Sequence, residues 1–222
     1  MTETAERYRS HPFRVLGASS RNTREQLNAL RTEAALFGRD EAAEDALTAL
    51  LHPDSRLDAE IRWFPMTEEK EISALFRYAE QEAVTEPVPD FGARSFLALF
   101  NRVRLCLSLL PIPREDAFTA SLYSLSLCAD TLIPRQVIWE INEDRKVAGF
   151  PPLMSEAEAD AAISDLLRET ADSLIQRRPD SLRGRAAKEL SERLLREYRD
   201  MKSPRHNSYL VRITAESLAA LP

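Results

Sequence analysis

Residues Pro12 to Gly17, which read Pro-Phe-Arg-Val-Leu-Gly, begin the stretch of sequence that decides the fold. We expect a short helix that ends at Gly17, because glycine adopts without strain the positive φ that turns a chain out of a helix. Ala18 to Asn22 then make a polar connection. This short helix is therefore predicted to lead into a second, longer helix.

A helical hairpin is predicted to follow. Thr23 and Gln26 have the spacing of a capping box, which places a helix start at Thr23. Apolar residues recur every three or four positions from Leu27 to Phe37 and from Ala43 to Leu51, so each run forms one apolar stripe. Pro53 ends the second run, because proline cannot continue a helix. Two amphipathic helices joined by a tight polar turn are expected to pack antiparallel.

This order of helices resembles the J domain of the DnaJ co-chaperones. Phe-Arg-Val-Leu-Gly is similar to the family's aromatic-x-Val-Leu-Gly opening, and Thr23 to Phe37 is similar to its long second helix. Leu51 to Arg56 resembles the Leu-x-Asp-Pro-x-x-Arg turn that closes its third helix. The resemblance implies a J-domain-like helical domain over residues 1–66.

One departure from the J-domain pattern concerns the loop between the second and third helices. The family carries His-Pro-Asp there, whereas this chain has Phe37-Gly38-Arg39-Asp40. A His-Pro-Asp does occur one helix later, at His52, Pro53 and Asp54. We interpret it as an ordinary helix end, since histidine favours the negative end of a helix and proline often follows one. The alternative is that His52, Pro53 and Asp54 form the functional loop.

The resemblance also implies a protein partner. In the family the second helix is basic and docks on a DnaK-type ATPase, whereas here its arginines are offset by Glu25 and Glu33. Phe37 suits a docking surface and a core equally well. The candidate partner-binding residues are Arg24, Arg31, Phe37, Arg39 and Asp40.

The rest of the chain predicts further helices and no strand, so the expected class is all-α. Trp63 to Pro65 reads as an apolar plug that joins the first segment to a larger helical domain at 67–222, with a possible subdivision near 149–154. The run 93–110 is apolar nearly all round and is expected to be a central helix. Another buried helix is expected at 115–129.

Composition favours an intracellular protein. The chain has 222 residues and two cysteines, Cys106 and Cys128, both within apolar stretches where a thiol is usually a core residue. The longest uncharged run, Ala117 to Ala129, is too short to cross a bilayer. A cytoplasmic protein with no membrane partner is therefore expected.

No pattern of catalytic or cofactor-binding residues is apparent. The five glycines are scattered, and the three histidines lie far apart without zinc-ligand spacing. Glu140, Glu143 and Asp144 share a helix, where a solvated or ion-paired role is the usual one. We therefore expect no enzyme, cofactor or metal site.

A basic segment supplies a further hypothesis. The net charge of the chain is −6, yet residues 175–205 hold ten Lys or Arg against five Asp or Glu. A nucleic-acid binder through the basic helix 177–205 is the third choice, because Tyr198 is the segment's one aromatic residue and acidic residues alternate with the basic ones. The first choice is a non-enzymatic co-chaperone-like or adaptor protein, and the second is a structural or regulatory subunit of a larger assembly.

Overall fold

The protein is all-α, as expected from its sequence. The computed structural model describes residues 3–80, 94–200 and 206–221, and these residues form helices and connections without a strand. In chain order the helices are α1 (Glu3–Arg9), α2 (Pro12–Leu16), α3 (Arg24–Leu36), α4 (Asp40–Leu51), α5 (Pro53–Ile61), α6 (Glu69–Ala79), α7 (Phe96–Leu109), α8 (Glu115–Ala129), α9 (Pro134–Ala148), α10 (Glu156–Gln176), α11 (Gly184–Asp200) and α12 (His206–Ala219).

The chain divides into two compact units, and the division differs from the expected boundary at residue 66. The first unit contains Met1–Leu109 and Pro134–Ala162, and the second contains Leu110–Ile133 and Ile163–Pro222. Residues 1–66 thus belong to a larger first unit, and the second division falls within α10 rather than near 149–154. The local stop signals at Pro65 and Pro151 end helices, but they do not separate cores.

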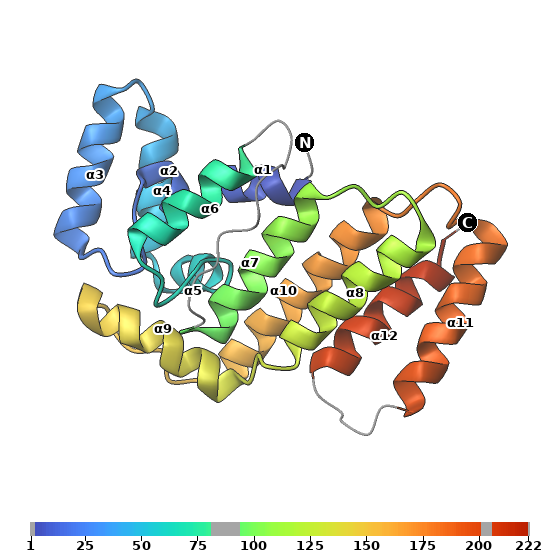
Figure 1. Cartoon of the computed structure of the whole chain (residues 1–222). Helices are drawn as coiled ribbons and strands as arrows, with labels where there is room; N and C mark the ends of the chain where they lie inside the picture. Colours follow the sequence, from blue (N-terminus) through green and yellow to red (C-terminus); the bar gives the residue numbers. More distant parts are fainter. Residues whose placement is uncertain (1–2, 81–93, 201–205, 222) are drawn as a thin grey trace. The chain divides into compact units, whose positions relative to one another are not determined.

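The predicted lead-in helix and hairpin are confirmed. Gly17 ends α2 with φ 65° and ψ 29°, the left-handed conformation that favours glycine. Thr23 caps α3 in the predicted capping box, since the Gln26 backbone N–H donates to Thr23 Oγ1 at 3.2 Å and the Thr23 N–H donates to Gln26 Oε1 at 2.9 Å. Helices α3 and α4 lie side by side and antiparallel, and α4 also packs against α2 and α5 (Figure 1).

A buried aromatic cluster explains why the core continues past residue 66. The ring of Trp63 lies 5.3 Å from that of Phe13 in α2 and 5.8 Å from that of Phe76 in α6. The Asn101 side chain of α7 donates to the backbone oxygens of Ile61 and Trp63 at 2.9 and 2.7 Å. The predicted plug therefore joins α2, α6 and α7 into one core, in which large aromatic side chains contribute much of the buried area.

The second unit is built on α8, α11 and α12. Helix α8 has the bounds expected from the sequence, and α12 packs against both α8 and α11. The buried face of α12 consists of Leu210, Val211, Ala215 and Leu218. Between α11 and α12, the Ser191 hydroxyl donates to the backbone oxygen of Ala215 at 2.8 Å.

Several helix ends differ from the expected ones by a few residues. Helix α5 begins at Pro53 rather than near Arg56, since proline suits the first turn of a helix. Glu68 rather than Thr67 caps α6. The linker expected at 84–92 lies outside the described residues.

Candidate functional site

The tip of the α3–α4 hairpin carries two exposed apolar side chains. Leu36 is 82% and Phe37 71% exposed, which decides for Phe37 between a surface and a core position. Gly38 reverses the chain with φ 73°, and Arg39 follows as an exposed cation. We call Leu36, Phe37 and Arg39 the hairpin tip. A groove of about 610 Å³ adjoins it, with Val15, Leu16, Leu30 and Ala34 in its lining beside Phe37 and Arg39.

Two other candidate docking residues brace the hairpin. The Arg31 guanidinium of α3 lies 3.0 Å from Asp40 and 2.7 Å from Glu44, both on α4. These are partly exposed pairs, which typically contribute less than about 1 kcal/mol each. Arg31 and Asp40 therefore fix how α3 and α4 meet, next to the hairpin tip.

Arg24 lies at the opposite end of α3 from Phe37. A helix rises about 1.5 Å per residue, so the two ends of α3 are about 18 Å apart. The Arg24 guanidinium stands 5.1 Å from the centre of the Phe150 ring. The structure thus brings Phe37 and Arg39 together and places Arg24 elsewhere.

His52, Pro53 and Asp54 form the junction between α4 and α5. His52 is the last cap of α4 and the first cap of α5, with φ −83° and ψ 130°, and Pro53 occupies the first turn of α5. All three residues are exposed. This geometry is that of the turn after the third helix, whereas Phe37 to Arg39 occupy the turn between the second and third helices.

A buried charge cluster lies behind this junction. Arg56 Nε donates to Glu60 Oε1 at 2.7 Å, and Arg145 Nε of α9 donates to Glu60 Oε2 at 2.8 Å. The side chains of Arg56 and Glu60 are each 2% exposed, and that of Arg145 is 9% exposed. Arg56 also donates to the backbone oxygens of Leu50 and Ser20. Burial lowers the pKa of Arg56, and the positive charges of Arg145 and Arg24 lower it further, although Glu60 opposes them.

Two further acids of α9 are buried and hydrogen-bonded. Glu140 accepts the Ser95 hydroxyl and the Leu97 N–H on one oxygen, at 2.7 and 3.1 Å, and so caps α7. Asp144 accepts the Ser20 hydroxyl at 2.5 Å and the Arg21 Nε–H at 2.7 Å. The expectation of a solvated face does not apply to these two residues, which hold α9 against other parts of the first unit.

A cavity of about 330 Å³ opens beside the buried charge cluster. Its lining comes from the start of α3, the α4–α5 junction, the end of α9 and the segment that follows it, so residues distant in sequence meet there. We call it the arginine cavity. Its lining residues are Arg24, Leu51, Pro53, Asp54, Arg56, Leu57, Arg145, Phe150, Pro151, Pro152, Leu153, Met154, Ser155 and Glu158.

Sequence analysis had identified Arg24, Pro53 and Asp54 but had not connected them. It missed Phe150 and Arg145, because their contacts with Arg56 span most of the first unit's sequence and leave no local signal. The spacing of Asp144 and Arg145 after Glu140 could have suggested one buried face on α9.

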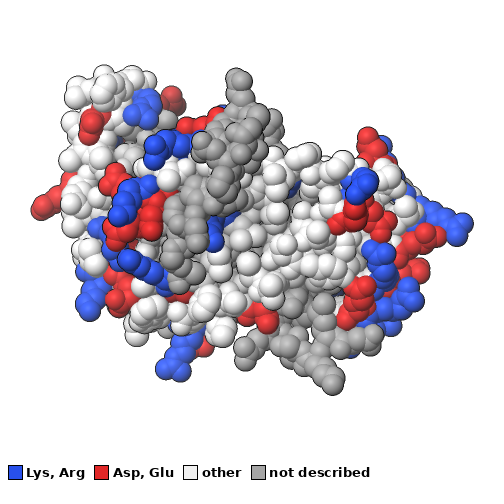
Figure 2. Space-filling view, viewed as in Figure 1, with Lys and Arg blue, Asp and Glu red and all other residues white. Residues whose placement is uncertain are grey.

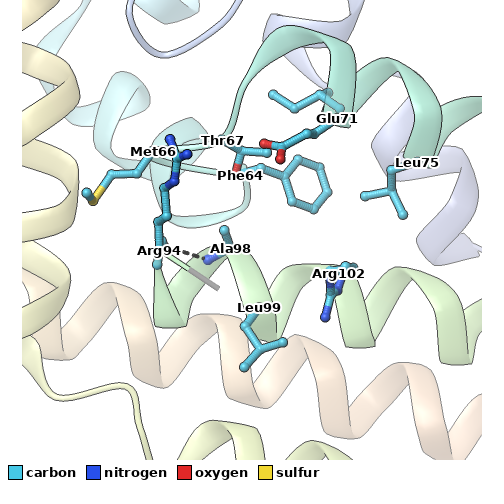
Figure 3. Close-up of a pocket in the computed structure, with 11 residues that line it drawn as sticks. Phe64, Met66, Thr67, Glu71, Leu75, Arg94, Ala98, Leu99 and Arg102 are labelled. Atoms are coloured by element: carbon cyan, nitrogen blue, oxygen red, sulfur yellow. Dashed lines mark hydrogen bonds between the residues drawn. The ribbon is translucent and has the colours of Figure 1, made fainter. Parts of the chain in front are cut away.

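A smaller hollow lies between α6 and α7. Figure 3 shows Phe64 and Leu75 on one side of it and Ala98 and Leu99 on the other. Its volume is about 20 Å³, enough for about one water molecule. It is too small for a ligand of any size, so it is not a candidate site.

The described part of the basic segment has many of its cations engaged. Arg193 lies 2.9 Å from Glu115 of α8, and Arg185 lies 2.6 Å from Glu189. Arg177 donates to the backbone oxygen of Leu110. On the face drawn in Figure 2, basic and acidic side chains are interspersed. Residues 201–205 lie outside the described residues, and nucleic-acid binding stays a prediction.

The described residues contain no group of three His, Cys, Asp or Glu side chains placed to hold a metal ion. Within the same part of the chain, no helix has both the length and the apolar character that crossing a membrane requires.

The two cysteines differ in their surroundings, which gives a prediction of reactivity. Cys106 is buried in α7, and burial raises the pKa of its thiol to about 11. Since the thiolate is the reactive form, we expect Cys106 to react with a disulfide reagent at pH 8 about 100-fold more slowly than an ordinary thiol. Cys128 is partly exposed and is expected to react first. Mass spectrometry of the labelled protein would locate the modified residue, and equal labelling of both would contradict the prediction.

Comparison with protein-family models, with curated proteins and with solved structures finds no match for this chain. The J-domain resemblance therefore rests on the residues quoted above.

Proposed function

We propose that this protein is a non-enzymatic, co-chaperone-like adaptor that binds a DnaK-type ATPase or its client through helical surfaces. The observation that carries the proposal is the hairpin tip, where Leu36 and Phe37 are exposed on a hairpin braced by Arg31. Large apolar side chains on a rigid turn gain free energy when a partner covers them, about 1.5–3 kcal/mol for each full burial.

The order of the helices supports the same proposal. A short helix ends at Gly17, a longer antiparallel pair follows, and the turn with Pro53 comes after its second helix. The loop at the hairpin tip lacks the family's His-Pro pair and keeps Asp40. Docking without stimulation of ATP hydrolysis is therefore the form of activity that we expect.

The proposal predicts that Leu36→Ser together with Phe37→Ser weakens binding to the source organism's DnaK-type ATPase by about 30-fold. Both side chains are exposed, so the fold should be unaffected, and the loss comes from apolar area that the partner no longer covers. Binding is measured by surface plasmon resonance with purified proteins. Leu127→Ser is the matched control, since Leu127 of α8 is 72% exposed and lies in the second unit.

Two results would count against this proposal. Equal binding by the double variant and the wild type would remove the hairpin tip as the docking surface. Absence of binding by the wild type, with every DnaK-type ATPase of the source organism, would remove the co-chaperone function.

The second candidate is a structural or regulatory subunit of a larger assembly. Trp139 and Val147 of α9 are 48% and 58% exposed, which favours a protein surface away from the hairpin tip. Size-exclusion of native extracts would then find the protein in one stoichiometric complex.

A further inference from the structure

The arginine cavity has the size and lining of a small binding site. About 330 Å³ lies at the lower end of the range for ligand pockets, which have mainly apolar walls and a few fixed polar groups. Leu51, Leu57, Phe150, Leu153 and Met154 contribute apolar side chains. Met154 is 80% exposed, so one wall stays open to a partner.

The buried cluster behind this cavity carries excess positive charge. Arg56 and Arg145 share one carboxylate, that of Glu60, so these three groups together have a net charge of +1. The guanidinium of Arg56 stacks on Phe150, with 3.5 Å between its central carbon and the ring centre. A positive charge next to an apolar wall favours a bound anion, because little water is present to screen it.

Arg24 adds a second, accessible cation. Its guanidinium stands near the ring of Phe150, and within the described ranges no carboxylate lies within ion-pair distance of it. The two acids of the lining, Asp54 and Glu158, are both exposed and therefore solvated. An incoming carboxylate would meet Arg24 first, with Arg145 and Arg56 behind it.

We propose that the arginine cavity binds the C-terminal residue of a partner protein, with its carboxylate paired to Arg24 and a large apolar side chain against Phe150 and Leu57. The limited volume favours one terminal residue over a longer internal segment. A guanidinium suits this role, because it can form two parallel hydrogen bonds with a carboxylate. The inference rests on the proposed function for the kind of partner, a protein, but it concerns a site distinct from the hairpin tip.

The test uses the dipeptide N-acetyl-leucyl-phenylalanine with a free carboxylate and the same dipeptide with a C-terminal amide. The full chain is labelled with ¹³C on its four methionine methyl groups, and the NMR signals are followed during titration. Met154 lines the arginine cavity and Met66 lines the small hollow between α6 and α7, so Met66 is an internal control. We expect the Met154 signal to shift in a saturable way while the Met66 signal does not, and the amide to bind at least about tenfold more weakly.

Substitutions distinguish the contributions of charge and shape. Arg24→Gln is expected to weaken binding of the free acid by about tenfold and to leave binding of the amide nearly unchanged. Met154→Glu, also at an exposed position, should weaken binding of the acid through like charge. Arg135→Gln removes an exposed arginine of α9 outside the cavity and should bind as the wild type does. The double variant of the hairpin tip should also bind the dipeptide, so failure of the proposed function would not be mistaken for failure here.

Three outcomes would overturn the inference. The first is the absence of a Met154 shift at 10 mM dipeptide, roughly ten times the dissociation constant expected of a weak site. The second is equal binding of acid and amide, or of Arg24→Gln and wild type. The third is tighter binding of 4-phenylbutyrate than of the dipeptide acid, which would assign the cavity to small free acids rather than to a protein terminus.

Discussion

Replacement of Glu60 by alanine is expected to lower the free energy of unfolding of the first unit by about 3–5 kcal/mol. Glu60 is the shared acceptor of Arg56 and Arg145, and all three side chains are buried. Without it, two guanidiniums would face each other in a site from which water is largely excluded. Removing one partner from a buried ion cluster is far more costly than removing the whole cluster, because the remaining charge stays uncompensated.

Urea unfolding followed by tryptophan emission measures this effect. Both tryptophans, Trp63 and Trp139, lie in the first unit, so the signal reports on that unit. Glu60→Gln keeps the shape and one acceptor oxygen, and its loss should be smaller than that of the alanine variant. Glu33→Ala, at an exposed position of α3, should change stability by less than about 0.5 kcal/mol. A Glu60→Ala protein as stable as the Glu33→Ala protein would show that the cluster does not hold the unit together.

Replacement of Asp144 by alanine is expected to destabilise the first unit by about 2–4 kcal/mol. Its carboxylate accepts the Ser20 hydroxyl and the Met66 N–H, and each buried donor left unpaired costs about 1–3 kcal/mol. It also pairs with Arg21, whose pKa it raises chiefly through the hydrogen bond between them. Arg21 is more than a third exposed, so we assign little of the stability to this pair.

Met66 adds a second measurement for the same site. Its φ of 57° is a left-handed conformation that a side chain disfavours, and its N–H is the one that Asp144 accepts. Met66→Gly should therefore raise the free energy of unfolding by up to about 1 kcal/mol, even in the Asp144→Ala background. Unfolding midpoints in urea test both variants. An Asp144→Ala protein that loses less than about 0.5 kcal/mol would contradict the account.

The sequence predicted individual helices well because their signals are local. The capping box at Thr23, the glycine at the end of α2 and the apolar period of α8 each involve residues a few positions apart. Such signals are sufficient for an all-α prediction. They also predicted the Trp63 plug, since bulky apolar residues next to a proline are rare at a surface.

The division into units and the buried charges could not be predicted in the same way. Arg145 meets Glu60 across 85 positions, and Asp144 meets Ser20 across 124. A charged residue on a helix looks the same in sequence whether its face is solvated or covered by another element. Glu140, Asp144 and Arg145 were therefore expected at the surface and are instead among the buried residues of the first unit.

The candidate site shows the same limit. Phe37 and Arg39 could be predicted as neighbours because they share a turn. Arg24, Asp54 and Phe150 meet only because three separate segments converge on one cavity, and no spacing in the sequence encodes that convergence.

The central claim is that the hairpin tip docks a protein partner of the DnaK type. It is tested most directly by the dissociation constant between the full chain and the source organism's DnaK-type ATPase, measured for the wild type and for Leu36→Ser with Phe37→Ser. The account predicts saturable binding by the wild type and about 30-fold weaker binding by the variant, a difference of about 2 kcal/mol. Equal dissociation constants for the two proteins, or no binding by the wild type, would contradict it.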